Sequence, residues 1–279
     1  MLRFEKWQAL GNDYVIVQSE ALPWELTAER VKRICDPHFG VGSDGILLLR
    51  RLGGDPEAVA ELRIFNPDGS EAELSGNGAR QAALYVHRHG WSDTDTFSIR
   101  TAAGLVTPTI TSPRTCVIEM GRAATSSKDF PSGGADGRGR LEAAGGEWEF
   151  QHVSIGNPQC AIEVADGLEK LDVATIGPEI ENHELFPNRT NVSFWRADGS
   201  RVRARIFERG VGETLSSGTG AGGAAVAALL RGAPSPVTVE LDGGELEVEV
   251  SGDLDVRLSG WAEPVLTGEF SQEMLDSLA

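Results

Sequence analysis

Several stretches of this chain alternate hydrophobic and polar residues with the period of two that is typical of β-strands. The clearest case is residues 237–241 and 245–250, which flank Asp242-Gly243-Gly244 and predict a hairpin. Residues 2–10 and 14–18 predict an earlier strand pair, joined by a turn at Gly11-Asn12-Asp13. We therefore expect the chain to begin with two paired β-strands.

The remaining elements follow from local pattern and turn residues. Further strands are expected at residues 46–50, 61–65, 152–155, 160–164, 191–196 and 201–207, with short, broken strands over residues 96–120. Helices are expected at residues 26–36, 79–89, 168–181, 222–230 and 271–278. Residues 121–146 are rich in Gly, Ala and Ser and lack a sustained period, so they predict a linker or long surface loop.

Two glycine-rich frames dominate this pattern. Ser75-Gly76-Asn77-Gly78-Ala79 and Ser217-Gly218-Thr219-Gly220-Ala221 share the order Ser-Gly-polar-Gly-Ala, and each runs into a helical stretch. The first backbone N–H groups of a helix have no partner within the helix and favour anions. A frame that recurs half a chain apart suggests two similar halves, each aiming a helix N-terminus at a shared cleft.

The expected fold class is therefore α+β. We predict two pseudo-symmetric domains, each a mainly antiparallel sheet wrapped around a central helix, because a helix lined by Ala and Gly can be surrounded closely by strands. We place one domain at residues 1–118 with 265–279 and the other at residues 119–264.

Composition narrows the class of ligand. The 279 residues are 40% hydrophobic and 24% charged, as in a globular protein, and the net charge of −17 argues against nucleic-acid or anionic membrane partners. No secretory signal or membrane-length apolar run is visible. Cys35, Cys116 and Cys160 are odd in number and widely spaced, which favours free thiols in the cytoplasm. We expect a small-molecule ligand.

Several motifs together resemble the diaminopimelate epimerase family of cofactor-independent amino-acid epimerases. They are residues 66–70, 75–80, 156–158 and 208–221, with residues 11–13 and 188–192 fitting the same pattern. The resemblance implies two pseudo-symmetric domains with one substrate between them. It also implies removal of an α-proton from one face of an amino acid and return of a proton to the other face, without pyridoxal phosphate or metal. Two opposed helix N-termini suit the stabilisation of the carbanion.

The resemblance also implies the functional residues, and here the chain departs from the family. Ser75 and Ser217 stand where the family has its two catalytic cysteines, and Gln159 stands where it has a histidine. A hydroxyl is a far weaker acid than a thiol, so these serines alone do not make an efficient pair of proton-transfer groups. The substrate-binding positions are kept: Asn12, Asn66, Asn157 and Asn191, Glu208 and Arg209 for the distal amino and carboxylate groups, and Gly76, Asn77, Gly218 and Thr219 for the α-carboxylate.

Three functions stay open at this stage. The first is epimerisation of an amino acid, most simply LL- to meso-diaminopimelate in lysine and cell-wall precursor synthesis. The second is an isomerase or lyase that needs only one base, for which Asp68, Asp44 or Glu213 are candidates. The third is an amino-acid-binding homologue without turnover. An engineered substrate trap would explain two Cys-to-Ser changes but not Gln159. We expect no cofactor or metal, and a homodimer as a candidate assembly.

Overall fold

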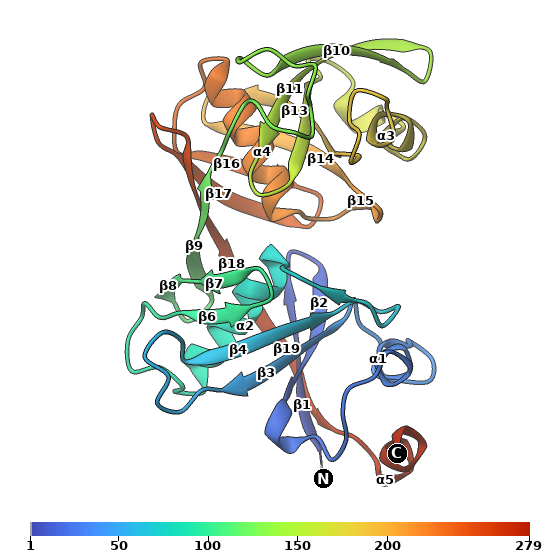
Figure 1. Cartoon of the computed structure of the whole chain (residues 1–279), viewed down its shortest axis with the longest axis vertical. Coiled ribbons are helices and arrows are strands. Elements are labelled where there is room, and N and C mark those ends of the chain that lie inside the picture. The colour runs from blue at the N-terminus through green and yellow to red at the C-terminus, as the bar shows by residue number, and fades with distance from the viewer. Residues whose placement is uncertain (1) are drawn as a thin grey trace. The chain divides into compact units, whose positions relative to one another are not determined.

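The computed structural model describes residues 2–279 and separates into two compact units (Figure 1). One comprises Met1–Ile118 with Gly260–Ala279, and the other comprises Glu119–Ser259. Strand β9 (Thr115–Arg122) and strand β18 (Asp255–Trp261) each continue from one unit into the other. The units are thus joined by two strands. No helix of the described residues is long and apolar enough to cross a membrane.

Both units are built from the same order of elements. The first contains β1 (Arg3–Ala9), β2 (Asn12–Gln18), η1 (Ser19–Ala21), α1 (Ala28–Cys35), β3 (Ile46–Arg51), β4 (Ala60–Phe65), β5 (Glu71–Ala72), α2 (Gly76–Arg88), β6 (Ile99–Thr101) and β7 (Gly104–Val106). The second repeats this order in β11 (Gly146–Ser154), β12 (Pro158–Glu163), η2 (Leu168–Lys170), α3 (Val173–Glu181), β13 (Asn191–Asp198), β14 (Arg201–Glu208), β15 (Gly212–Thr214), α4 (Gly218–Leu230), β16 (Val237–Leu241) and β17 (Gly244–Val250). The remaining elements are β8 (Pro108–Ser112), β10 (Arg138–Ala143), β19 (Glu263–Glu269) and α5 (Gln272–Leu278).

Strand pairing repeats as well. The first sheet runs β19-β1-β2-β3-β4-β6-β7, and the second runs β10-β11-β12-β13-β14-β16-β17-β18-β9-β8. Among the described residues, the parallel pairs of the first sheet are β2 with β3 and β4 with β6, and the corresponding pairs β12 with β13 and β14 with β16 are parallel in the second. The other pairs recorded are antiparallel. The predicted α+β fold with two similar, mainly antiparallel halves is confirmed.

The small residues of α4 allow strands to approach it closely. A Cβ atom added at Gly220 would lie 2.8 Å from Ile206 of β14, and one added at Gly223 would lie 2.9 Å from Gln159 of β12. The helix contacts strands β11 to β14, β16 and β17, so the sheet surrounds it on several sides. Because protein interiors are densely packed, this helix can be central only if its side chains stay small.

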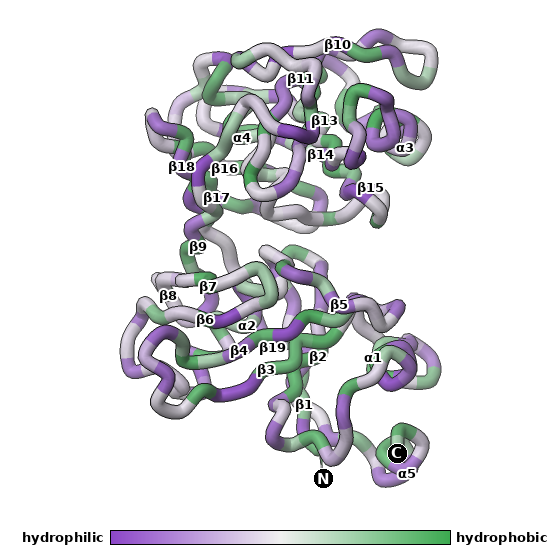
Figure 2. Tube along the Cα trace, viewed as in Figure 1, coloured by the Kyte–Doolittle hydropathy of each residue, from purple (hydrophilic) through white to green (hydrophobic). Residues whose placement is uncertain are grey.

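The other long helix of each unit has one apolar side. Val31 and Ile34 of α1 are buried in one hydrophobic cluster, and Ile176 and Ile180 of α3 are buried in another. Figure 2 shows hydrophobic residues in green and hydrophilic residues in purple along both α1 and α3, as expected for helices with one buried and one exposed side. Each unit therefore has its own hydrophobic core.

One expected loop is partly regular structure. Within residues 121–146, strand β10 (Arg138–Ala143) pairs antiparallel with β11, and Phe130 is buried against the rings of Phe150 and Phe186. The junction between the compact units lies in β9 instead of in this segment. The prediction of a structureless linker was wrong for this strand, because Arg138, Arg140 and Glu142 are exposed and alternate with more buried residues, a period of two within a segment rich in Gly and Ala.

Candidate active site

Ser75 is the N-cap of α2. Its Oγ accepts a hydrogen bond from the backbone N–H of Gly78 at 3.1 Å, which fixes the start of the helix. The phenolic O–H of Tyr14 on β2 donates to the same Oγ at 3.3 Å. Ser75 therefore accepts two hydrogen bonds through Oγ, and its own O–H group can act as a donor to a ligand.

Ser217 is the N-cap of α4 and occupies the matching place in the second unit. Its Oγ accepts from the backbone N–H of Gly220 at 3.2 Å and donates its proton to Oε2 of Glu208 at 3.0 Å. Oε1 of Glu208 accepts from the hydroxyl of Thr214 at 2.8 Å. Burial raises the pKa of the Glu208 carboxyl above its ordinary value, and the two hydrogen bonds pull it the other way. Ser217 is thus coupled to a proton acceptor.

A chain of amides supports the first turn of α4. The Asn157 side-chain amide donates to Oγ1 of Thr219 at 3.2 Å, and Gln159 donates to Oδ1 of Asn157 at 2.8 Å. Gln159 is fully buried, and its Oε1 has no hydrogen-bond partner among the described residues. Gln159 therefore holds Asn157 in place, and among the described residues no hydrogen bond joins its side chain to Ser217.

Arg209 directly follows Glu208 in the sequence. Its backbone N–H donates to Oδ1 of buried Asn191 at 2.9 Å, and its Nη1 donates to the carbonyl oxygen of Asn188 at 3.0 Å. Within residues 2–279 no acidic side chain lies within 4.0 Å of the Arg209 guanidinium. A guanidinium without an acidic partner is suited to bind a ligand carboxylate.

The structure thus places Asn157, Glu208, Ser217, Gly218 and Thr219 at the N-terminus of α4, and Arg209, the residue after Glu208, is hydrogen-bonded to Asn191. In the first unit it places Ser75, Gly76 and Asn77 at the N-terminus of α2. Asn12 is joined to that helix through its carbonyl oxygen, which accepts from Gln81 at 3.0 Å. Asn66 follows β4 directly and donates to Ser70.

The three carboxylates proposed as single bases have other partners. Asp44 accepts from the Asn12 side chain at 3.0 Å, and Glu213 forms an ion pair with Arg205 at 2.6 Å. Asp68 accepts from Ser70, and these hydrogen bonds lower the pKa of the Asp68 carboxyl. A lowered pKa makes a carboxylate a weaker base. Glu208, which the sequence assigned to substrate binding, is the carboxylate that contacts a candidate proton-transfer group.

A buried arginine adds charge at the N-terminus of α2. Arg80 is fully buried and donates from Nη2 to the side chain of Asn77, while its Nε and Nη1 have no partner among residues 2–279. Burial lowers the pKa of the Arg80 guanidinium to about 10. A cation here adds to the positive end of the helix dipole and so favours an anion in front of α2.

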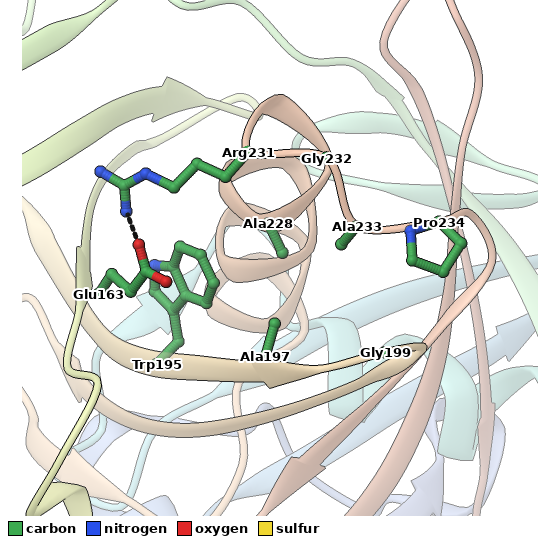
Figure 3. A pocket seen from close by; sticks show the side chains of 9 residues that line it. All are labelled: Glu163, Trp195, Ala197, Gly199, Ala228, Arg231, Gly232, Ala233 and Pro234. Carbon is green, nitrogen blue, oxygen red and sulfur yellow. Dashed lines mark hydrogen bonds and ion pairs between the residues drawn. The ribbon is translucent and has the colours of Figure 1, made fainter.

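A shallow, open pocket lies elsewhere on the second unit, at the opposite end of α4. It has a volume of about 230 Å³ and is lined by residues that include Trp195, Glu163 and Arg231. Figure 3 shows Arg231, just after α4, reaching the carboxylate of Glu163 beside the indole ring of Trp195, and this ion pair measures 2.8 Å. Because α4 has 13 residues and an α-helix rises about 1.5 Å per residue, this pocket lies roughly 20 Å from Ser217. It is separate from the residues that the motifs single out.

A family model and several individual proteins that resemble this chain point to the same family. The family model described as diaminopimelate epimerase matches residues 4–126 and 151–262. Diaminopimelate epimerase 2 of Nostoc sp. is 38% identical, with 98% of this chain and 97% of that protein covered. The diaminopimelate epimerase of Pelotomaculum thermopropionicum is 39% identical (96% and 99% covered), and that of Azoarcus sp. is 40% identical (96% and 98% covered).

Solved structures share the fold at lower identity. A predicted epimerase from Pseudomonas aeruginosa superposes with a TM-score of 0.69 at 18% identity, covering 97% of this chain and 99% of that one. A probable proline racemase from Agrobacterium radiobacter, solved with carbonate, gives a TM-score of 0.68 at 15% identity, with 98% and 93% covered. At this level of identity these similarities concern the fold.

Proposed function

This chain belongs to the diaminopimelate epimerase family, and from that membership we propose that it is a cofactor-independent epimerase that interconverts LL- and meso-diaminopimelate. The identities of 38 to 40% over nearly the whole chain support the substrate. The hydrogen bond from Ser217 to Glu208 is the observation that supports turnover, because it gives one of the two serines a base.

We propose Ser75 and Ser217 as the groups that serve the two faces of the α-carbon. On the Ser217 face, the Cα–H bond breaks and its proton passes to Oγ of Ser217 as the Ser217 proton passes to Oε2 of Glu208. The electron pair of the broken bond remains on the α-carbon. Backbone N–H groups at the helix N-termini, including those of Gly76 and Gly218, oppose the charge of the α-carboxylate and of the carbanion.

For binding, we propose Arg209 for the distal carboxylate, because its planar fork matches two carboxylate oxygens. Asn12, Asn66, Asn157 and Asn191 are proposed to orient the polar ends of the substrate. Asn77 and Thr219 flank the glycines that bind the α-carboxylate. Glu208, which lies beside Ser217, is proposed to act in proton transfer and to attract the ammonium group of the substrate.

We further propose a cytoplasmic location, supported by three buried cysteines without disulfide partners. A homodimer, and the absence of nucleic-acid and membrane partners, stay predictions from the sequence. Pyridoxal phosphate and metal are not part of the proposed reaction.

The test is uptake of solvent deuterium at the α-carbon of LL- and meso-diaminopimelate, followed by NMR and chiral separation. Deuterium uptake with inversion supports the epimerase. Uptake with retention of configuration would replace it by a one-base isomerase or lyase. Binding of diaminopimelate, measured by calorimetry, with no uptake would replace it by the binding homologue.

A further inference from the structure

The two repeats carry different side chains at one matched position. The frames are related by a shift of 142 residues, which brings Ser75 onto Ser217 and both ends of α2 onto those of α4. The same shift brings Asn66 onto Glu208, each nine residues before its serine. Strand pairing supports this alignment, because Phe65 pairs with Glu71 in the first unit as Phe207 pairs with Glu213 in the second.

This alignment leaves Ser75 without the counterpart of the Glu208 carboxylate. Asn66 is an amide and cannot accept a proton near neutral pH, and its Nδ2 donates to Ser70 at 3.0 Å. The neighbour that Ser75 does have is Tyr14, whose O–H points its proton at Oγ of Ser75. One serine gives its hydroxyl proton to a neighbour, and the other receives a neighbour's proton in a hydrogen bond.

The position of the Tyr14 ring is set by the backbone around it. Tyr14 is buried on β2, and a Cβ atom added at Gly45 would lie 2.8 Å from Cε1 of the ring and 2.2 Å from the carbonyl oxygen of Phe65. Gly45 also has a φ of +153°, which side chains rarely adopt. The chain thus brings backbone against the ring at a place where only glycine fits, and this holds the phenol against Ser75.

We infer that Tyr14 is a positioning residue that makes Ser75 the acid when the α-proton is removed on the Ser217 face, and the reverse reaction follows the same proton transfers backwards; this inference rests on the proposed function. The O–H bond of Ser75 breaks as its proton forms the new C–H bond with the electron pair on the α-carbon. In the same step the Tyr14 proton moves to Oγ of Ser75, so no serine alkoxide accumulates. Tyr14 is left as phenolate and regains a proton from water, while Glu208 returns its proton to water.

The test is Tyr14→Phe, which removes the phenolic oxygen and leaves the ring. Inversion is expected to fall about 100-fold, the lower part of the range for loss of a general acid, while deuterium exchange with retention changes less than about threefold. The ratio of exchange to inversion therefore rises, and a purely structural role for Tyr14 would leave this ratio unchanged. Ser75→Ala is expected to give the same ratio, and the double variant no further change.

The sequence offers a matched control. Its only other tyrosine is Tyr85, a buried residue of α2 whose phenolic oxygen accepts from Gln18 at 2.9 Å. Tyr85→Phe loses a buried hydroxyl from the same unit and is expected to keep the wild-type ratio. In that background, 3-fluorotyrosine replaces Tyr14 alone, and its fluorine is only slightly larger than the ring hydrogen it replaces. The more acidic phenol is expected to move the alkaline fall of the inversion rate to lower pH.

The outcomes separate this inference from the proposed function. If the wild type exchanges no deuterium, the proposed function fails before Tyr14 is tested. If the wild type inverts diaminopimelate and Tyr14→Phe inverts it at an unchanged rate, the role of Tyr14 is overturned. An unmoved alkaline limb with 3-fluorotyrosine overturns it as well, even if Tyr14→Phe does not fold.

Discussion

Replacing Glu208 by Gln should slow proton exchange at the substrate without destabilising the fold at neutral pH. Both carboxylate oxygens accept a hydroxyl proton, Oε2 from Ser217 at 3.0 Å and Oε1 from Thr214 at 2.8 Å. Glutamine has nearly the same shape but cannot take up a proton. A general base contributes roughly 10²- to 10⁴-fold to a rate, so the activation barrier for exchange on the Ser217 face should rise by about 3 to 5 kcal/mol.

The same substitution should increase the stability of the folded protein at neutral pH relative to acidic pH. Burial raises the pKa of Glu208 in the folded protein above its ordinary value of 4.5. Such a carboxyl contributes stability that is fully present below pH 4.5, where it is protonated in both states, and lost as pH rises through the folded pKa. Glutamine does not titrate. The free energy of unfolding of Glu208→Gln, relative to wild type, should therefore be more favourable at pH 7 than at pH 4.

Deuterium uptake measures the first effect, and urea unfolding at pH 4 and pH 7 measures the second. Glu213→Gln is the matched control, since it makes the same chemical change on β15 in a residue that pairs with Arg205 instead of Ser217. Exchange within about threefold of wild type in Glu208→Gln would show that Glu208 is not the base. A larger loss of stability at pH 7 than at pH 4 would show that the fold favours the charged carboxylate.

Three further predictions address the remaining parts of the site. Ser75→Cys with Ser217→Cys should raise the inversion rate at least about tenfold, because a thiol ionises near pH 8.5 and helix N-termini lower that value; an unchanged rate in the folded variant would contradict the assignment of these positions. Arg209→Lys keeps the charge but loses the fork, so the KM for diaminopimelate should rise about tenfold with little change in kcat, as steady-state kinetics would show. Gly223→Ala should lower the free energy of unfolding by about 1 to 3 kcal/mol in a urea titration, since the added Cβ would lie 2.9 Å from Gln159.

The internal repeat is the part of the fold that the sequence predicts best. Two Ser-Gly-polar-Gly-Ala frames half a chain apart indicate two similar halves, and both serines do cap helices that match in length and place. The small residues after Gly218 also indicate that this helix is enclosed by strands. Such signals are visible because they lie within a few consecutive residues.

The features that the sequence did not predict depend on contacts between residues far apart in the chain. Strand β10 (Arg138–Ala143) alternates polar and more apolar residues over only six positions within a segment rich in Gly and Ala, and its pairing with β11 is what makes it a strand. Tyr14 lies 61 residues from Ser75, and no local pattern connects them. The pairing of Glu208 with Ser217 could have been suspected from the sequence, because aligning the two frames places an amide and a carboxylate at one position nine residues before each serine.

Alignment of the repeats also explains how serines could replace thiols. A thiol near its pKa can give or take a proton by itself, whereas a hydroxyl needs a neighbour to accept or supply one. Ser75 and Ser217 each accept a hydrogen bond from the backbone N–H three residues later, so the repeat gives both serines the same helix-capping geometry. The difference comes from the neighbouring side chains, since Glu208 accepts from one serine and Tyr14 donates to the other. The resting protein is therefore arranged to take an α-proton on the Ser217 face and to deliver one on the Ser75 face.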